Sequence, residues 1–165
     1  MANDALWVYK GLVMSGIGVW MIMAAFNNLL DPQTNTLFLR KMMSMEDIKL
    51  DGRLGQGLLF RSLDVDSFVL PMLRAIAFMQ IVIGLSLLAS AVLIINVPVE
   101  IIDLSVDATL TIATSANMLF AVHWLFFLIG GLWFGYWIKM GKVQIVHFTM
   151  LILSLLLQLL ISSSI

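Results

Sequence analysis

The sequence has no cysteine and few charged residues, and each shortage excludes a set of possibilities. Without cysteine, the chain cannot form disulfides, thiolate metal sites, iron–sulfur clusters or a cysteine nucleophile. The absence of cysteine does not indicate the cellular compartment. Charged residues make up 12% of the 165 residues, whereas a soluble domain has about 25%. Because so few charges cannot cover a surface in water, we expect most of the chain to lie in lipid. A net charge of −1 gives no indication of nucleic-acid binding.

The chain contains instead four long apolar stretches that are free of Asp, Glu, Lys and Arg. They cover residues 11–30, 75–97, 118–138 and 143–161. Each is about 20 residues long, which at ~1.5 Å per residue crosses roughly 30 Å of hydrocarbon. Because backbone groups in lipid must pair within their own segment, these stretches are expected to be helices. The sequence therefore predicts an all-α membrane protein, with four transmembrane helices in one up-down bundle over residues 1–165. The third helix can begin earlier, with Asp107 as its N-cap.

Positive charges are concentrated on one side of the expected membrane. The loop over residues 31–68 carries Arg40, Lys41, Lys49, Arg53 and Arg61, and the connection before the last span adds Lys139 and Lys142. The opposite side has only Lys10. The positive-inside rule then predicts that the large loop is cytoplasmic and that both termini lie outside. No basic secretory signal is evident at the start, so the first span is expected to be retained.

The two histidines, His123 and His147, are the first candidates for a metal or haem site. Both fall within expected helices. If residues 139–142 form the turn between those helices, the depths of the two imidazoles differ by roughly 15–18 Å. A single chain could not then hold one haem with both. We therefore interpret each histidine as hydrogen-bonded between helices, with metal binding as the alternative.

Met42, Met43 and Met45 are the second metal candidates. Three thioethers within four residues offer soft ligands to Cu(I). The same segment, Leu37–Met45, also has the pattern of a short amphipathic helix on the membrane surface, and we favour this interpretation. No set of residues predicts a catalytic or cofactor-binding site. The sequence requires no cofactor, and we expect lipids to be bound to the protein.

The stretch AFNNLLDPQTNTLFLRKMMSMED, residues 25–47, ends the first span with an unusual polar pattern. Asn27 and Asn28 are expected to end the helix and to satisfy its last carbonyls. Asp31 and Pro32 are expected to turn the chain, and Thr34 or Asn35 to cap the surface helix. A second pattern, GGLWFGYW over residues 130–137, contains a G-x-x-x-G pair suited to helix packing.

These two patterns resemble a family of small bacterial integral membrane proteins of unknown function. The residues that carry the resemblance, or form its packing motif, are Asn27, Asn28, Asp31, Asn35, Phe38, Ser44, Met45, Gly131, Trp133, Phe134, Gly135 and Trp137. The resemblance implies the four-helix layout and no reaction. Lys41 and Leu132 stand where the family tends to have His and Glu, so a metal or proton-transfer role is not carried over. We interpret the motifs as one packed cap that holds the long loop against the membrane.

These observations lead to three functional hypotheses. The first is a non-catalytic accessory subunit of a larger membrane enzyme complex, of the respiratory or copper-dependent oxidase or monooxygenase type. Its partners would be membrane lipids and other membrane subunits, or further copies of the chain. The alternatives are a small oligomeric transporter or channel, and a metal- or haem-binding membrane protein.

Overall fold

The computed structural model describes the backbone of residues 2–163 and the side chains of residues 4–163. Its described part contains helices and no strand. Four helices are long and apolar enough to cross a membrane: α1 (Ala2–Leu30), α4 (Val69–Asn96), α5 (Val106–Trp133) and α7 (Gly141–Ser162). The expected all-α membrane bundle is therefore confirmed.

The third long helix differs from its expected span at both ends. It begins at Val106, and its N-cap is Ser105, whose hydroxyl accepts a hydrogen bond from the Ala108 amide at 3.2 Å. The alternative cap, Asp107, lies instead in the first turn. The helix ends at Trp133 because Gly135 has a left-handed backbone with φ of 65°. A four-residue helix, α6 (Tyr136–Lys139), then leads into α7. The chain between α5 and α7 therefore turns earlier than expected.

The first loop contains the expected surface helix, α2 (Pro32–Met43), followed by α3 (Glu46–Asp51) and the 3₁₀ helix η1 (Gln56–Arg61). The helix begins earlier than expected because Pro32 occupies its first turn, where a missing N–H costs nothing. Neither Thr34 nor Asn35 is its cap, since both lie inside the helix. The expected cap is therefore wrong: the position belongs to Asp31, whose carboxylate accepts a hydrogen bond from the Thr34 hydroxyl at 2.6 Å.

The long helices pair into two hairpins, α1 with α4 and α5 with α7, and α4 joins them by packing on α5. Glycines allow the closest approach in the first hairpin. A Cβ at Gly18 would lie 3.0 Å from the Gly84 carbonyl oxygen, and one at Gly84 would lie 2.9 Å from the Gly18 oxygen. Small residues at such a crossing bring two helix backbones into contact in lipid. The expected Gly131–Gly135 pair has a different role: Gly135 forms the turn, and Gly131 makes room for the Tyr136 ring.

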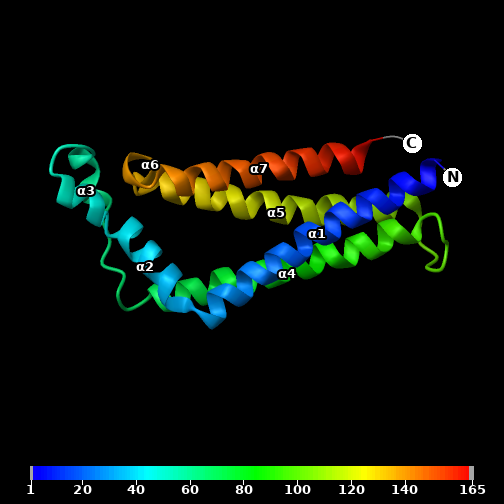
Figure 1. Cartoon of the computed structure of the whole chain (residues 1–165), viewed down its shortest axis with the longest axis horizontal. Coiled ribbons are helices and arrows are strands. Elements are labelled where there is room, and N and C mark those ends of the chain that lie inside the picture. The colour runs from blue at the N-terminus through cyan, green and yellow to red at the C-terminus, as the bar shows by residue number, and fades with distance from the viewer. Residues whose placement is uncertain (1, 164–165) are drawn as a thin grey trace.

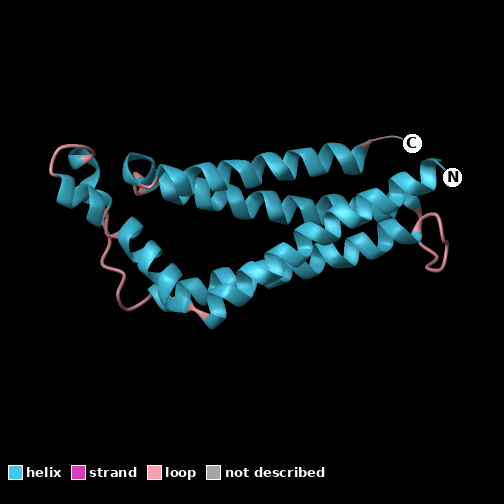
Figure 2. Ribbon diagram, viewed as in Figure 1, coloured by secondary structure: helices cyan, strands magenta, loops and turns pink. Residues whose placement is uncertain are grey.

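The hairpins lie close together near the two termini and diverge toward the other end, where α2 lies across the interval (Figure 1). Most of the chain is helix, and the longest loops lie at the two ends (Figure 2). One core fills the half near the termini and includes Met21, Leu87 and Phe120. A second core includes Met45, Ile48 and Phe134 and packs the first loop against the end of α5. The bundle is therefore tightly packed in two places, with a cavity between them.

Candidate ligand cavity

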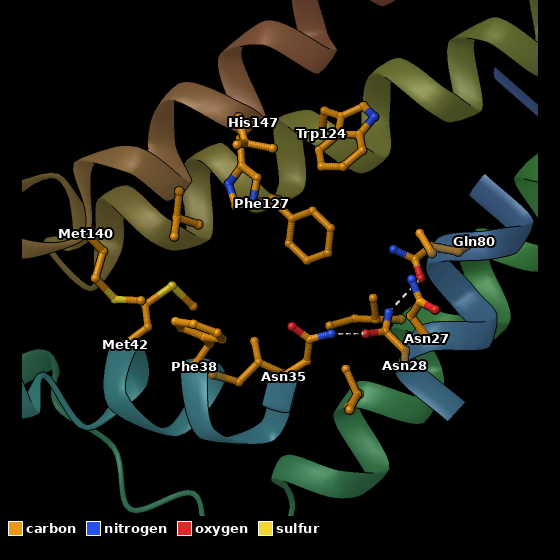
Figure 3. Close-up of a pocket in the computed structure, with 16 residues that line it drawn as sticks. Asn27, Asn28, Asn35, Phe38, Met42, Gln80, Trp124, Phe127, Met140 and His147 are labelled. Atoms are coloured by element: carbon orange, nitrogen blue, oxygen red, sulfur yellow. Dashed lines mark hydrogen bonds between the residues drawn. The ribbon is translucent and has the colours of Figure 1, made fainter. Parts of the chain in front are cut away.

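A cavity of about 320 Å³ lies between the two hairpins. One wall comes from α1, α2 and α4, and the other comes from α5, α7 and the residue that precedes α7 (Figure 3). The lining residues are mostly apolar or aromatic, and none of them is Asp, Glu, Lys or Arg. The cavity is only partly enclosed. Its size and apolar character are those of small-molecule sites.

One side of the cavity carries a chain of three amide side chains from three helices. Asn35 of α2 donates to the Oδ1 atom of Asn28 at 2.6 Å. Asn28 of α1 donates in turn to the Oε1 atom of Gln80 in α4, at 2.8 Å. The Asn28 and Gln80 side chains are only 7% and 6% exposed. Because polar groups in lipid need internal partners, this chain ties the end of α1 to its neighbours.

The amide chain has a direction, and its two ends face the cavity. Every donor in it points from Asn35 toward Gln80, so the Oδ1 atom of Asn35 and the Nε2 atom of Gln80 remain free. Both atoms point toward the interior in Figure 3. The expectation that the paired asparagines satisfy the carbonyls of α1 is therefore wrong for Asn28. Asn27 lines the cavity, is exposed, and makes no side-chain hydrogen bond within the described residues.

The opposite wall is aromatic. His147 stacks on Phe127, with ring centroids 5.1 Å apart and an interplanar angle of 22°. It also lies 5.7 Å from the Trp124 ring and 5.8 Å from the Tyr136 ring. His123 meets the other side of this cluster, edge-on to Phe127 at 4.6 Å. The wall therefore presents stacked and tilted rings from α5 and α7 to the cavity.

The positions of the histidines correct two expectations. Both imidazoles contact the same phenylalanine, so they do not lie at the well-separated depths expected for them. The reason is the early end of α5 at Trp133, which puts His123 closer to the turn and so closer in depth to His147. The expected interhelical hydrogen bonds of the histidines are also absent among the residues that the structure describes. The Nε2 atom of His123 and the Nδ1 atom of His147 are buried without a partner among the described residues.

The three candidate methionines contribute to packing. Met43 and Met45 are buried in the second core, and Met42 packs against that core while also lining the cavity. Met45 has a left-handed backbone with φ of 53°, at the turn between α2 and α3. Among the described residues, no group of three His, Asp or Glu side chains is arranged to hold a metal ion.

The cap around the first loop gathers several of the remaining motif residues. The Ser44 carbonyl accepts a hydrogen bond from the Ser62 hydroxyl at 2.9 Å, and Phe134 belongs to the second core. Arg61 donates to the Trp133 carbonyl at 3.3 Å, and its guanidinium lies 4.8 Å from the Trp133 ring. Trp137 is half-exposed.

An ion pair between Lys139 and Asp51 closes the cap by joining α6 to α3. The hydrogen bond from Lys139 holds the pKa of the Asp51 carboxyl below its ordinary value, helped by the backbone amide of Leu54. Arg53 lies next to the same carboxylate. The contact also has an apolar part, because Ile48 of α3 is buried in the second core and Ile138 of α6 packs against that core.

The structure thus divides the sequence motifs between two places. Asn27, Asn28, Asn35 and Phe38 line the cavity, whereas the motif residues of the cap surround the second core. The sequence patterns did not point to Gln80, Trp124 and Phe127 as parts of one site. The available signal was the presence of a single glutamine within the second span, because a polar residue in such a helix needs a partner.

The fold and cavity define a four-helix integral membrane protein with an internal apolar site. Residues 6–163 match the family described as "Predicted small integral membrane protein (DUF2165)". The match covers nearly the whole chain, so the protein belongs to this family, and the resemblance drawn from its motifs is confirmed. No curated protein and no solved structure matches the chain.

Proposed function

We propose that the protein binds a neutral lipophilic molecule from the bilayer, and that it does so without catalysing a reaction. The observation that supports this proposal is the cavity between the hairpins. It combines apolar and aromatic walls with a few fixed amide groups, a composition typical of small-molecule sites.

The surroundings of the cavity favour a bound molecule over an empty space. The first core, near the termini, and the second core, at the loop end, are both well packed, and each includes side chains with almost no exposed surface. Side chains that line a void lose dispersion contacts that a bound molecule would restore. Because the cavity is partly open and lies within the spans, the surrounding lipid phase is the natural source of that molecule.

A matched pair of substitutions tests this proposal. Val143→Phe places a ring in the cavity, whereas Val122→Phe adds the same ring at an exposed position of α5 that does not line it. We expect an environment-sensitive apolar dye to bind the unchanged protein and Val122→Phe equally. We expect Val143→Phe to bind it roughly tenfold more weakly or worse, as clashes of this kind cost more than 1 kcal/mol. Equal binding by all three proteins would contradict the proposal.

A second candidate is an accessory subunit in a larger membrane complex, of the respiratory or copper-dependent oxidase or monooxygenase type. The observation that favours it is the wide exposed face of α7. Only 17% of the most apolar stretch of α7 is buried within the chain, against 33% to 39% for the other three long helices. Such a face suits a partner helix as well as lipid. Comigration with a defined complex after mild extraction would support this role, and a lone monomer in every mild detergent would contradict it.

We also propose a bacterial inner-membrane location, with the first loop in the cytoplasm and the termini outside. Most of the cationic side chains lie in or next to the cap end, at α2, α3, η1 and α6, where both the loop and the α5–α7 connection are found. Lys10, the lysine at the opposite end, is buried, and it donates to the carbonyls of Ile161 and Ser163 at 3.3 and 2.9 Å. The exposed positive charge therefore lies almost entirely at the cap end.

A further inference from the structure

We infer that the molecule held in this cavity is a flat, neutral lipophile with carbonyl acceptors, of the quinone class, and that Gln80 donates to it. This inference rests on the proposed ligand-binding function and names the chemistry of the ligand.

The first argument is an unused hydrogen-bond donor. Gln80 is 6% exposed, and its Oε1 atom is occupied by Asn28. Its Nε2 atom has no hydrogen-bond partner within residues 4–163 and points into the cavity (Figure 3). A donor that is removed from water and left unpaired is costly. The ligand atom that satisfies it must be an acceptor, and a carbonyl oxygen is the simplest acceptor on a membrane-soluble molecule.

The orientation of Gln80 is fixed by its neighbours. Asn35 donates to Asn28, and Asn28 donates to Gln80, so the oxygen of the glutamine is used and its nitrogen is left for the ligand. At the Gln80 end of the amide chain, this arrangement selects an acceptor over a donor on the bound molecule. The Gln80 donor is therefore preorganised for the ligand, and preorganisation reduces the entropy lost on binding.

The second argument is the absence of charge in the lining. No Asp, Glu, Lys or Arg contributes to the walls. A charged ligand would have to leave water without a counter-ion, and the cost of such a transfer is large. Phosphate head groups and fatty-acid carboxylates are therefore poor occupants. A neutral head group is the kind that the cavity accepts.

The third argument is the shape of the walls. Phe127, Trp124 and His147 form one wall, with centroid separations of 5.1 to 5.7 Å among neighbouring rings. Phe38 lies on the α2 side of the cavity (Figure 3). Flat rings stack favourably on flat ligands, whereas a flexible acyl chain gains nothing from their orientation. The cavity thus favours a planar head group.

His147 supplies a second polar group across the cavity from Gln80 (Figure 3). Its Nδ1 atom is buried, so the ring nitrogen that a ligand can reach is Nε2, which makes no hydrogen bond among the described residues. A quinone ring carries two carbonyl oxygens on opposite edges, so one can accept from Gln80 while the other faces the imidazole. This two-sided arrangement is what selects the quinone class among neutral carbonyl compounds.

The test compares two flat probes that share a carbon skeleton, one with two carbonyl groups and one with none. The full-length protein in mild detergent is titrated calorimetrically with 1,4-naphthoquinone and with naphthalene. Because one hydrogen bond to a buried donor contributes up to about a factor of ten, we expect the quinone to bind roughly tenfold more tightly. Quinones react fastest with thiols, and the chain has no cysteine, so the main covalent side reaction is avoided.

Substitutions test which residues cause the preference for the quinone over naphthalene. Gln80→Leu is expected to lose the preference for the quinone while still binding naphthalene. Gln158→Leu is the matched control, because Gln158 also bridges helices in the membrane, through Asn117 and Thr114, but does not line the cavity. It should keep the preference. If Gln80→Leu fails to fold, His147→Phe replaces it, since this change keeps a stacking ring and removes the second polar group.

The possible outcomes separate the two proposals. Equal affinity for both probes, with both lost in Val143→Phe, would overturn the quinone inference and leave the lipophile-binding function standing. Stronger binding of a neutral monoacylglycerol than of the quinone would overturn it in the same way. No binding of any probe, with no effect of Val143→Phe, would overturn the proposed function itself.

Discussion

Asn27 and Asn28 are neighbours in the sequence but have different surroundings in the fold. Asn28 is buried and joins α1 to α2 and α4, whereas Asn27 is exposed and makes no side-chain hydrogen bond among the described residues. The sequence indicated that the pair is unusual. It could not identify Gln80 as the partner of Asn28, because the two are 52 residues apart and no local pattern connects them.

This difference predicts unequal effects of the same substitution. Asn28→Ala removes the centre of the amide chain and leaves Asn35 and Gln80 without their partner. We expect it to lower the free energy of unfolding by about 1 kcal/mol, the range of hydrogen bonds between membrane helices. Asn27→Ala should change it little. Thermal unfolding in detergent measures both, and equal losses of stability would contradict the roles assigned here.

At the scale of the helices, hydropathy predicted which segments span the membrane but not where each helix ends. The first turns of α5 contain Asp107 and several threonines. Hydropathy therefore leaves these residues out of the expected span, even though they are helical. The end of α5 depends on the backbone of Gly135, and glycine within an apolar run gives no clear sign of a turn. In the first loop, the end of α3 and the start of η1 likewise depend on the left-handed backbones of Gly52 and Gly55.

Gly135 gives a direct test of this boundary. Its φ of 65° is a conformation that other residues adopt at a cost, and a Cβ there would lie 3.3 Å from side-chain carbons of Ile48 and Leu58. Gly135→Ala is therefore expected to destabilise the protein by ~1 kcal/mol or more. The control is Gly130→Ala, since Gly130 is helical and has open space at its Cβ position. Similar unfolding temperatures for the two variants would argue against the turn.

The α3–α6 contact predicts a pH dependence. Lys139 holds the pKa of Asp51 below its ordinary value, so the ion pair stabilises the cap above the unfolded pKa of about 4 and is lost as the pH falls through the lower, folded value. Backbone amides of α3 should exchange faster with solvent below about pH 4, after correction for intrinsic rates. Asp51→Asn should show the faster exchange at every pH. A pH-independent exchange pattern in the unchanged protein would contradict this role.

For the molecule as a whole, the sequence predicted the bundle but not its cavity. The four spans and the surface helix follow from hydropathy and amphipathic pattern. The divergence of the hairpins depends on where they pack together, which is the first core near the termini, and on the second core under the first loop. Neither can be recognised without knowing which helices are neighbours. The sequence consequently indicated a group of motif residues at the end of the first span, but not the cavity that several of them line.

The proposed orientation can be tested with a single introduced cysteine, because the chain has none of its own. Leu54 lies exposed in the first loop, and Val99 lies exposed in the connection between α4 and α5. In intact cells, a membrane-impermeant maleimide should label Val99→Cys and should label Leu54→Cys only after the membrane is opened. The reverse labelling pattern would show that the first loop faces outside.

The central claim, that the cavity holds a neutral lipophile, is tested most directly by native mass spectrometry of the protein extracted from its own membranes. The account predicts one bound neutral molecule per chain, released intact for chemical identification. It predicts that Val143→Phe lacks this molecule and that Val122→Phe keeps it. A bare protein mass for the unchanged chain, or the same bound molecule in Val143→Phe as in Val122→Phe, would contradict the claim.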